Sequence, residues 1–324
     1  MKILQVIGPG SEFEILEKPV PIPAQGEALI KIDGVTTCPQ WDLHLRHNEP
    51  MFIGHHFHYP YTPGQPGHEA TGIVEEVGEG VHSFHPGDRV SVWRDAGHQI
   101  YGCYAQYVVR PITDIIRIPA DLTPEAAAPL ELAMCVGAVF LMLREMNGLH
   151  GKRVGISGLG PAGLIAMQMA KAEGASEVFG FDTEEVRRNY AVNHGLFQAY
   201  DPLNTPESLP PARPSECGLD TSVDCVGARA SVEFMMDHSR NIVALFGVQR
   251  EEYHFAPKHY MHLKLCGYSG HSYEAAKYAL QLIEAGKLDL SILVTHHLPL
   301  EKYKEGIALL ESKEAIKVCF NPWP

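Results

Sequence analysis

The segment from residue 153 to 182, RVGISGLGPAGLIAMQMAKAEGASEVFGFD, constrains the fold more than any other part of this 324-residue chain. Its glycines Gly158, Gly160 and Gly163 follow a β-branched strand and open a helix with the spacing G-x-G-x-x-G. The first allows a tight turn, the second lets backbone amides approach a pyrophosphate, and the third lets the helix pack closely on the strand. The segment therefore predicts a βαβ unit that binds a dinucleotide.

An acidic residue completes this pattern. Asp182 stands nineteen residues after Gly163, directly after a second apolar strand. A carboxylate at this place can accept both ribose hydroxyls and repel a 2′-phosphate, so we expect NAD rather than NADP. Arg187 and Arg188 follow closely and could weaken that preference. The candidate cofactor-binding residues are Gly158, Gly160, Pro161, Ala162, Gly163, Asp182 and Arg187.

The chain changes character near Ala120. Before it, short segments rich in Val, Ile, Tyr and Thr are separated by Gly and Pro, which is typical of β-structure. After Thr123 helical periods appear, and beyond residue 151 strands and helices alternate, which indicates a doubly wound parallel sheet. A chain of this length with 45% hydrophobic residues can hold more than one core. We therefore expect two domains, one β and one α/β.

Charge and cysteine content narrow the class of protein. A formal net charge of -13 repels phosphate backbones and anionic membrane surfaces, so we expect neither nucleic acid nor membrane as a partner. No stretch reads as a secretory signal or approaches the roughly 18 uninterrupted apolar residues of a membrane span, and we expect a cytoplasmic protein. The seven cysteines include no Cys-x-x-Cys pair, which favours reduced thiols over a disulfide framework.

Two ionisable residues, His68 and Glu69, stand side by side before a glycine-punctuated apolar run in PGHEATGIVEEVG. Cys38, in the upstream loop GVTTCPQWDLHL, adds a sulfur donor. Thiolate, imidazole and carboxylate together suit Zn²⁺, and a dispersed set of three leaves the open position that a catalytic zinc needs. Each residue alone is also common in ordinary cores and loops, so the prediction depends on the combination.

The stretch GHEATGIVEEVGEGVHSFHPGDRV resembles the signature of zinc-dependent alcohol dehydrogenases of the medium-chain dehydrogenase/reductase superfamily, G-H-E-x-x-G followed by spaced glycines and G-D-x-V. The Cys38 loop, YAQYVV, the glycine turn, VDCVG and AIKVCFNP extend the resemblance over nearly the whole chain. The resemblance implies a GroES-like β-barrel catalytic domain formed by residues 1–132 and 268–324. A Rossmann-type NAD-binding domain, residues 133–267, would be inserted between them.

The resemblance also implies the metal ligands. It carries Cys38 and His68 over as ligands, with Glu69 either on the metal or just behind it. In the polyol and threonine dehydrogenase branch, a glutamate of an E-P-L segment lies at or near the metal. The segment PLELAMCVG offers Glu131 at that place, with Cys135 as the rival.

Three departures from the family pattern concern the site. Many relatives carry four closely spaced cysteines where RDAGHQIYGCYAQ has only Cys103, so we expect one catalytic zinc and no structural zinc. The Cys38 loop is one residue longer than C-x-[ST]-D and lacks the hydroxyl that relays the substrate proton. A long loop brings in further histidines, either as a solvated lid or as an additional metal site or substrate-contacting lid: His47, His55, His56 and His58.

Without this hydroxyl, another side chain has to accept the substrate proton. His44 matches the terminal relay histidine of the family, and an imidazole can accept a proton near neutral pH. The alternative is an ordinary surface histidine. The catalytic candidates are therefore His44 and Glu69.

The implied activity is zinc-assisted hydride transfer between an alcohol or polyol, or the corresponding carbonyl, and NAD. The family usually forms dimers or tetramers, so we expect a homo-oligomer. Two alternatives stay open. One is a zinc-free NAD(P)H-dependent reductase of the same superfamily that acts on an activated C=C bond, and the other is a non-catalytic NAD-binding redox sensor.

Overall fold

The computed structural model describes residues 1–196, 198–205 and 218–323, and the chain divides into two compact units. The first comprises Met1–Leu132 and Leu290–Pro324, and the second comprises Ala133–Asp289. The first boundary coincides with the expected one, whereas the second lies at Leu290 instead of residue 268. Residues 268–289 stay with the second unit because Tyr278 donates to Glu173 at 2.8 Å and the Gln168 amide bonds both backbone groups of Asp289.

The first unit is built on a mixed sheet of seven strands in the order β14-β15-β3-β4-β5-β7, with β6 also paired to β3. Only β14 and β15 pair in parallel; the other pairs are antiparallel. Strands β1 and β2 form a separate antiparallel pair in the same unit. The strands are β1 (Lys2–Gly8), β2 (Glu12–Glu17), β3 (Glu27–Thr36), β4 (Glu69–Val77), β5 (Arg89–Val92), β6 (Tyr107–Pro111), β7 (Ile115–Arg117), β14 (Val294–Pro299) and β15 (Lys317–Asn321).

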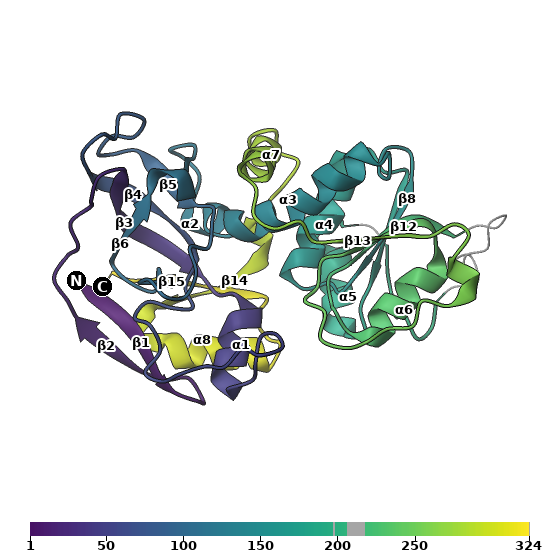
Figure 1. Ribbon diagram of the computed structural model, residues 1–324, viewed down its shortest axis with the longest axis horizontal. Coiled ribbons are helices and arrows are strands. Elements are labelled where there is room, and N and C mark those ends of the chain that lie inside the picture. Colours follow the sequence, from purple (N-terminus) through teal and green to yellow (C-terminus); the bar gives the residue numbers. More distant parts are fainter. Residues whose placement is uncertain (197, 206–217, 324) are drawn as a thin grey trace. The chain divides into compact units, whose positions relative to one another are not determined.

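Both ends of the chain share one hydrophobic core in this unit. Leu4 and Ile30 from the N-terminal part are fully buried together with Ile307 and Phe320 from the C-terminal part. Helix α8 lies against α1 and against β15, and both termini belong to this unit (Figure 1). Its helices are α1 (Pro39–His47), α2 (Pro124–Ala127) and α8 (Tyr303–Glu311), with single 3₁₀ turns at Ile112–Asp114, Ser291–Leu293 and Leu300–Lys302.

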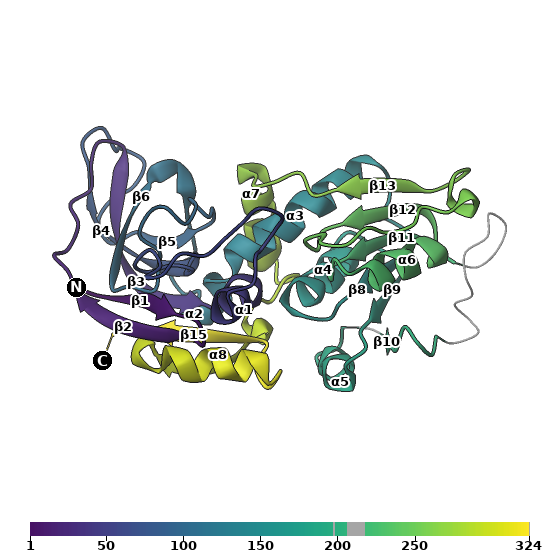
Figure 2. The same ribbon diagram turned by 60° about the horizontal axis from the view of Figure 1, so that its bottom comes forward.

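The second unit holds a six-stranded parallel sheet in the order β10-β9-β8-β11-β12-β13. The order reverses at β8, because β8 leads through α4 to β9 on one side while β11 leads through α6 to β12 on the other (Figure 2). Right-handed crossovers that run in opposite directions put their helices on opposite faces, and ligands bind at such a reversal. The strands are β8 (Arg153–Ser157), β9 (Glu177–Phe181), β10 (Gln198–Tyr200), β11 (Leu219–Asp224), β12 (Ser239–Leu245) and β13 (Lys264–Gly267).

The helices of this unit contact the sheet through apolar faces. Helix α4 lies on β8 and β9, α5 on β10, and α6 on β11 and β12. Buried side chains such as Leu164 and Met235 fill these contacts. The helices are most of α3 (Leu130–Glu145), α4 (Pro161–Ala172), α5 (Glu185–Asn193), α6 (Arg229–His238) and α7 (Tyr273–Glu284), and a 3₁₀ turn spans Pro257–His259.

One apolar stretch was missed in the sequence. Pro124–Glu145, which covers α2 and α3 (Leu130–Glu145), is long enough to cross a membrane and contains an 18-residue window with a mean hydropathy of 2.0. Glu131 interrupts this window, so the chain still has no run of about 18 uninterrupted apolar residues, but the window passes on its mean hydropathy. Because 78% of the window is buried inside the protein, the stretch has the character of a core helix. The six cysteines that the structure describes form no disulfide, and Cys217 lies outside the described residues.

Candidate functional site

The pairing of β3 with β4 brings the predicted metal ligands together. Thr36 at the end of β3 pairs with Glu69 at the start of β4, so the residues just beyond these two strand ends become neighbours. Cys38 is the N-cap of α1, and His68 directly precedes β4. One ligand atom from each of Cys38, His68 and Glu69 lies within 4.8 Å of the other two. Residues separated by about 30 positions therefore converge on one point.

His68 is buried and its ring is fixed for metal binding. Its Nδ1 bonds the carbonyl of Pro66 at 2.8 Å, which leaves Nε2 as the ligand atom, 3.8 Å from Oε2 of Glu131. A backbone carbonyl on the other ring nitrogen is the usual outer-shell support of a metal-binding imidazole. Burial disfavours the imidazolium, but the charges of Asp95 and Cys38 outweigh burial and raise the pKa of His68 well above its ordinary value. Such an anionic surrounding suits a divalent cation, and these residues fit zinc.

Glu69 is engaged by a lysine that the sequence analysis missed. Nζ of the fully buried Lys317 lies 2.6 Å from Oε1 and 2.7 Å from Oε2 of Glu69 and also donates to the carbonyl of Thr37. The Thr36 hydroxyl donates to Oε2 at 3.1 Å. Burial raises the pKa of Glu69, and Lys317 opposes that shift. Both oxygens of Glu69 already have donors, whereas Glu131 faces Nε2 of His68 directly. The only sequence signal for Lys317 was a single cation inside the apolar strand AIKVCF.

A buried aspartate holds the Cys38 loop in place. Asp42 accepts hydrogen bonds from the backbone N–H of Cys38 at 2.8 Å and from the hydroxyls of Tyr104 and Tyr303 at 2.9 to 3.1 Å. Burial raises the pKa of Asp42 to about 6, and these donors oppose the shift. Gln40 and Trp41 stand in this loop where the family pattern has its Ser or Thr hydroxyl; Gln40 is exposed and Trp41 is partly buried.

The other predicted histidines do not converge on the cluster. Nδ1 of His44, in α1, bonds the carbonyl of Glu49 at 3.1 Å, and the side chain is partly exposed. His47 pairs with Glu311 at 2.9 Å. In the long loop, Met51, Phe57 and Tyr61 are buried, so this loop is packed on the core rather than fully solvated. None of its histidines belongs to a metal-ligand group among the described residues.

The glycine turn of the second unit has the predicted geometry. Gly158 has a φ of +79°, in the left-handed region that favours glycine, and follows β8 directly. A Cβ on Gly163 would lie 1.8 Å from the carbonyl oxygen of Gly158, so a side chain there would displace helix α4. Gly160 caps α4, Pro161 and Ala162 form its first turn, and the nearest neighbour of a Cβ on Gly160 is 3.9 Å away. This open surface above a helix N-terminus fits a pyrophosphate.

Asp182 lies beside the turn. Its carboxylate accepts hydrogen bonds from the backbone N–H groups of Leu159 and Glu184, both at 2.8 Å. Nη1 of Arg187 lies 3.7 Å from the same carboxylate, whereas Arg188 donates to the backbone carbonyls of Asp182 and Thr183. Arg187 is therefore the cation that borders the predicted ribose position.

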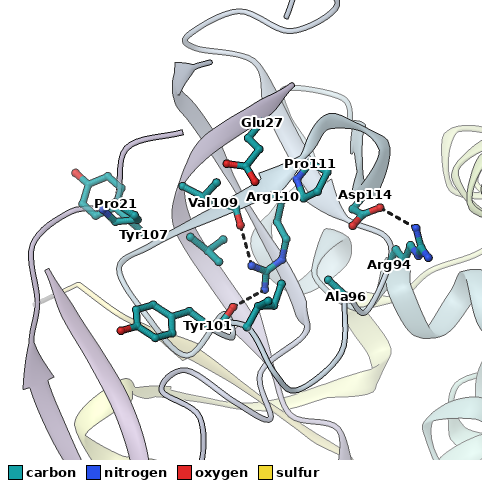
Figure 3. A pocket seen from close by; sticks show the side chains of 12 residues that line it. Pro21, Glu27, Arg94, Ala96, Tyr101, Tyr107, Val109, Arg110, Pro111 and Asp114 are labelled. Atoms are coloured by element: carbon teal, nitrogen blue, oxygen red, sulfur yellow. Dashed lines mark hydrogen bonds and ion pairs between the residues drawn. The ribbon is translucent and has the colours of Figure 1, made fainter. Parts of the chain in front are cut away.

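A cavity of about 460 Å³ lies in the first unit and contains none of the predicted site residues (Figure 3). Its wall includes Arg110, whose guanidinium donates to the carbonyls of Val109 and Tyr101, and Arg94, which pairs with Asp114 at 3.2 Å. These contacts fix both ends of the segment from residue 94 to 101. The cavity is therefore lined by residues that anchor this loop and not by the predicted metal or cofactor ligands.

Fold and site together define a two-unit nucleotide-binding protein whose β unit carries a Cys-His-Glu metal-ligand group. The alcohol dehydrogenase GroES-like domain family matches residues 24–120, and the zinc-binding dehydrogenase family matches residues 161–285. These matches cover about two thirds of the chain. The chain belongs to the zinc-dependent alcohol dehydrogenases of the medium-chain dehydrogenase/reductase superfamily, as the sequence predicted.

Individual relatives agree with this family. L-threonine 3-dehydrogenase of Bacillus subtilis is 27% identical over 95% of this chain and 94% of its own length. Sorbitol dehydrogenase of Halalkalibacterium halodurans is 26% identical over 96% of both chains. The crystal structure of 2R,3R-butanediol dehydrogenase from Bacillus subtilis has the same fold, with a TM-score of 0.84, 22% identity and 99% of both chains covered. The predicted combination of a GroES-like domain and a Rossmann-type domain is confirmed.

Proposed function

We propose that this oxidoreductase transfers a hydride between an alcohol or polyol and NAD, with one catalytic zinc. The observation that carries the proposal is the grouping of Cys38, His68 and Glu69 within 4.8 Å of one another, with Glu131 3.8 Å from Nε2 of His68, in a unit that matches the GroES-like domain. The polyol, threonine and alcohol dehydrogenases among the relatives support the substrate class. A cytoplasmic homo-oligomer without structural zinc belongs to the same proposal.

The residues have separate tasks in this proposal. Zinc and NAD, when bound, supply a Lewis acid that makes the alcohol hydroxyl acidic and an acceptor for the hydride. Cys38, His68 and Glu131 hold the metal and leave a position for the substrate oxygen. Lys317 compensates the charge of Glu69 behind the site. The amides at Gly160 and Ala162 would bind the pyrophosphate of NAD, and Asp182 would accept hydrogen bonds from its ribose hydroxyls.

The test uses an alcohol and polyol panel with NAD and NADP, together with elemental analysis of the same protein sample. We expect one zinc per chain and a kcat/KM for NAD at least about tenfold above that for NADP, a difference of about 1.4 kcal/mol. The reason is that Asp182, at 7% exposure, would face the 2′-phosphate. Arg187→Ala should widen the preference, because it removes the nearest cation.

The possible outcomes separate the alternatives. Turnover of an activated C=C bond without zinc would identify the zinc-free reductase, and NAD binding without any turnover would identify the redox sensor. Two zinc ions per chain would contradict the expectation that the chain holds no structural zinc. Equal kcat/KM values for NAD and NADP in the wild type would show that the role given to Asp182 is wrong.

His44 is proposed as the final acceptor of the substrate proton. With no hydroxyl side chain after Cys38, the proton would reach His44 through an ordered water or the cofactor ribose. His44→Gln should lower kcat for alcohol oxidation about tenfold at pH 7, with recovery at high pH as hydroxide takes over. Zinc content and NAD affinity should not change. His47→Gln, in the same helix, is the control, and full activity of His44→Gln from pH 6 to 9 would make His44 a bystander.

A further inference from the structure

The loop between β5 and β6 contains two potential metal ligands that the sequence analysis did not use. It includes the segment RDAGHQIYGCYAQ, which contains Asp95 and His98. Their side chains are only 16% and 9% exposed. One ligand atom from each of His68, Asp95 and His98 lies within 4.8 Å of the other two. The shortened loop therefore reaches the same histidine as the Cys38 group.

Several backbone contacts hold this loop against the segment that leads to His68. The buried Gln65 side chain donates to the carbonyls of Gly97 at 3.2 Å and Ile100 at 3.0 Å. The N–H of Cys103 donates to the carbonyl of Gly67 at 2.7 Å. A Cβ on Gly102 would lie 2.1 Å from the carbonyl oxygen of Gly64, so the two backbones meet in direct contact. The ligand positions on the loop are thus set before any ion binds.

Nε2 of His98 and Oδ2 of Asp95 face each other, and the second polar atom of each side chain already forms a hydrogen bond. Nδ1 of His98 bonds the Tyr61 hydroxyl at 2.7 Å, and the ring packs on Trp41 with 3.9 Å between centroids. Its Nε2 is buried, has no hydrogen-bond partner in the described part of the chain, and lies 3.5 Å from Oδ2 of Asp95. Oδ1 of Asp95 accepts the N–H of Gly97 at 2.8 Å. Nε2 of His98 and Oδ2 of Asp95 thus form an ion pair without hydrogen-bond geometry, and a cation placed between the two atoms would use donor capacity that this pair leaves unused.

The available lone pairs limit the number of ions. His68 has only Nε2 to offer, because its Nδ1 is bonded to Pro66. One imidazole nitrogen binds one metal ion, so the Cys38 side and the Asp95 side of His68 cannot each hold an ion through it. If the Cys38 group holds an ion through Nε2 of His68, any metal bond from Asp95 or His98 at this point must go to that same ion.

We propose that Asp95 and His98 are additional ligands of the one divalent transition-metal ion held at His68. This inference rests on the proposed metal site and extends its donor set to one thiolate, two imidazoles and carboxylate oxygen. Nitrogen and oxygen donors bind Zn²⁺, Co²⁺ and Fe²⁺ readily, so the ion should stay bound, more weakly, after loss of the thiolate. The ion should also show a higher coordination number than the four that a Cys-His-Glu set with one water provides.

Cobalt titration of metal-free protein tests this proposal without any activity measurement. Co²⁺ bound to the wild type should give a thiolate-to-metal absorption band together with weak d–d bands of a site above four-coordinate. Asp95→Asn and His98→Gln should each lower Co²⁺ affinity at least about tenfold, since even outer-shell losses cost 10- to 100-fold. Their d–d bands should gain intensity, and the thiolate band should persist. His56→Gln, at an exposed histidine, is the matched control.

A combination of variants separates the two ligand groups. Cys38→Ser should lose the thiolate band but still bind Co²⁺, and Cys38→Ser/Asp95→Asn/His98→Gln should bind none. Thermal unfolding of each metal-free variant checks folding. Tyr61→Phe keeps all ligands and removes only the hydrogen bond to His98, so it should lower the Co²⁺ affinity less than His98→Gln does. It replaces His98→Gln in the test if that variant does not fold.

Two results would overturn the inference in distinguishable ways. Wild-type affinity and unchanged d–d bands in Asp95→Asn and His98→Gln, with the thiolate band present, would remove these residues from the site and leave the proposed function intact. No thiolate band and no tight Co²⁺ binding in the wild type would overturn both the inference and the proposed metal centre.

Discussion

Serine in place of Cys38 is expected to lower the affinity for zinc at least about 100-fold, because loss of an outer-shell contact alone can cost that much. The kcat/KM for alcohol oxidation should fall about 10³-fold, since a Lewis-acid metal contributes several kcal/mol to the transition state. Helix α1 should stay intact, because the Cys38 side chain makes no capping hydrogen bond and serine is a favoured N-cap residue. Zinc content after dialysis against a chelator and steady-state kinetics measure both effects.

The matched control is Cys266→Ser in the second unit, because Cys266 has the same intermediate exposure as Cys38. It should keep wild-type zinc content and activity. Full zinc occupancy of Cys38→Ser after the same dialysis would show that Cys38 does not hold the metal. Loss of zinc with unchanged turnover would show that the reaction does not need it.

Methionine in place of Lys317 is expected to destabilise the first unit by about 3–5 kcal/mol, the cost of leaving a buried charge without its partner. Glu69 is 1% exposed, and Lys317 is the cation within salt-bridge distance of it. The remaining donor to its carboxylate would be the neutral hydroxyl of Thr36. Chemical denaturation of the metal-free protein measures the loss.

The double variant Glu69→Gln/Lys317→Met should recover most of this stability, because it removes both charges from the core. Lys304→Met is the control, since Lys304 forms an exposed ion pair with Glu12 and such pairs contribute little. A loss in Lys317→Met no larger than in Lys304→Met would mean that the buried pair is not what holds β15 to β3 and β4 at the site.

Much of this protein could be predicted from the sequence because the signals are local. The glycine turn, its strand and its helix lie within about 30 residues, and their dihedral and close-packing requirements allow few residue types, as at Gly158 and Gly163. The His68-Glu69 pair likewise stands at the start of a recognisable strand. Local backbone geometry thus determined the two domain types, the nucleotide-binding turn and the core of the metal-ligand group.

Only the tertiary structure shows which further side chains lie next to the metal-ligand group. Lys317 lies 248 positions from Glu69 and reaches it because β15 pairs with β3, which also pairs with β4. Asp95 and His98 lie near His68 because hydrogen bonds from Gln65 hold their loop in position. The residues next to them in the sequence give no sign of these hydrogen bonds. Such contacts arise from strand register and backbone packing over long separations, whereas sequence patterns report only on neighbours along the chain.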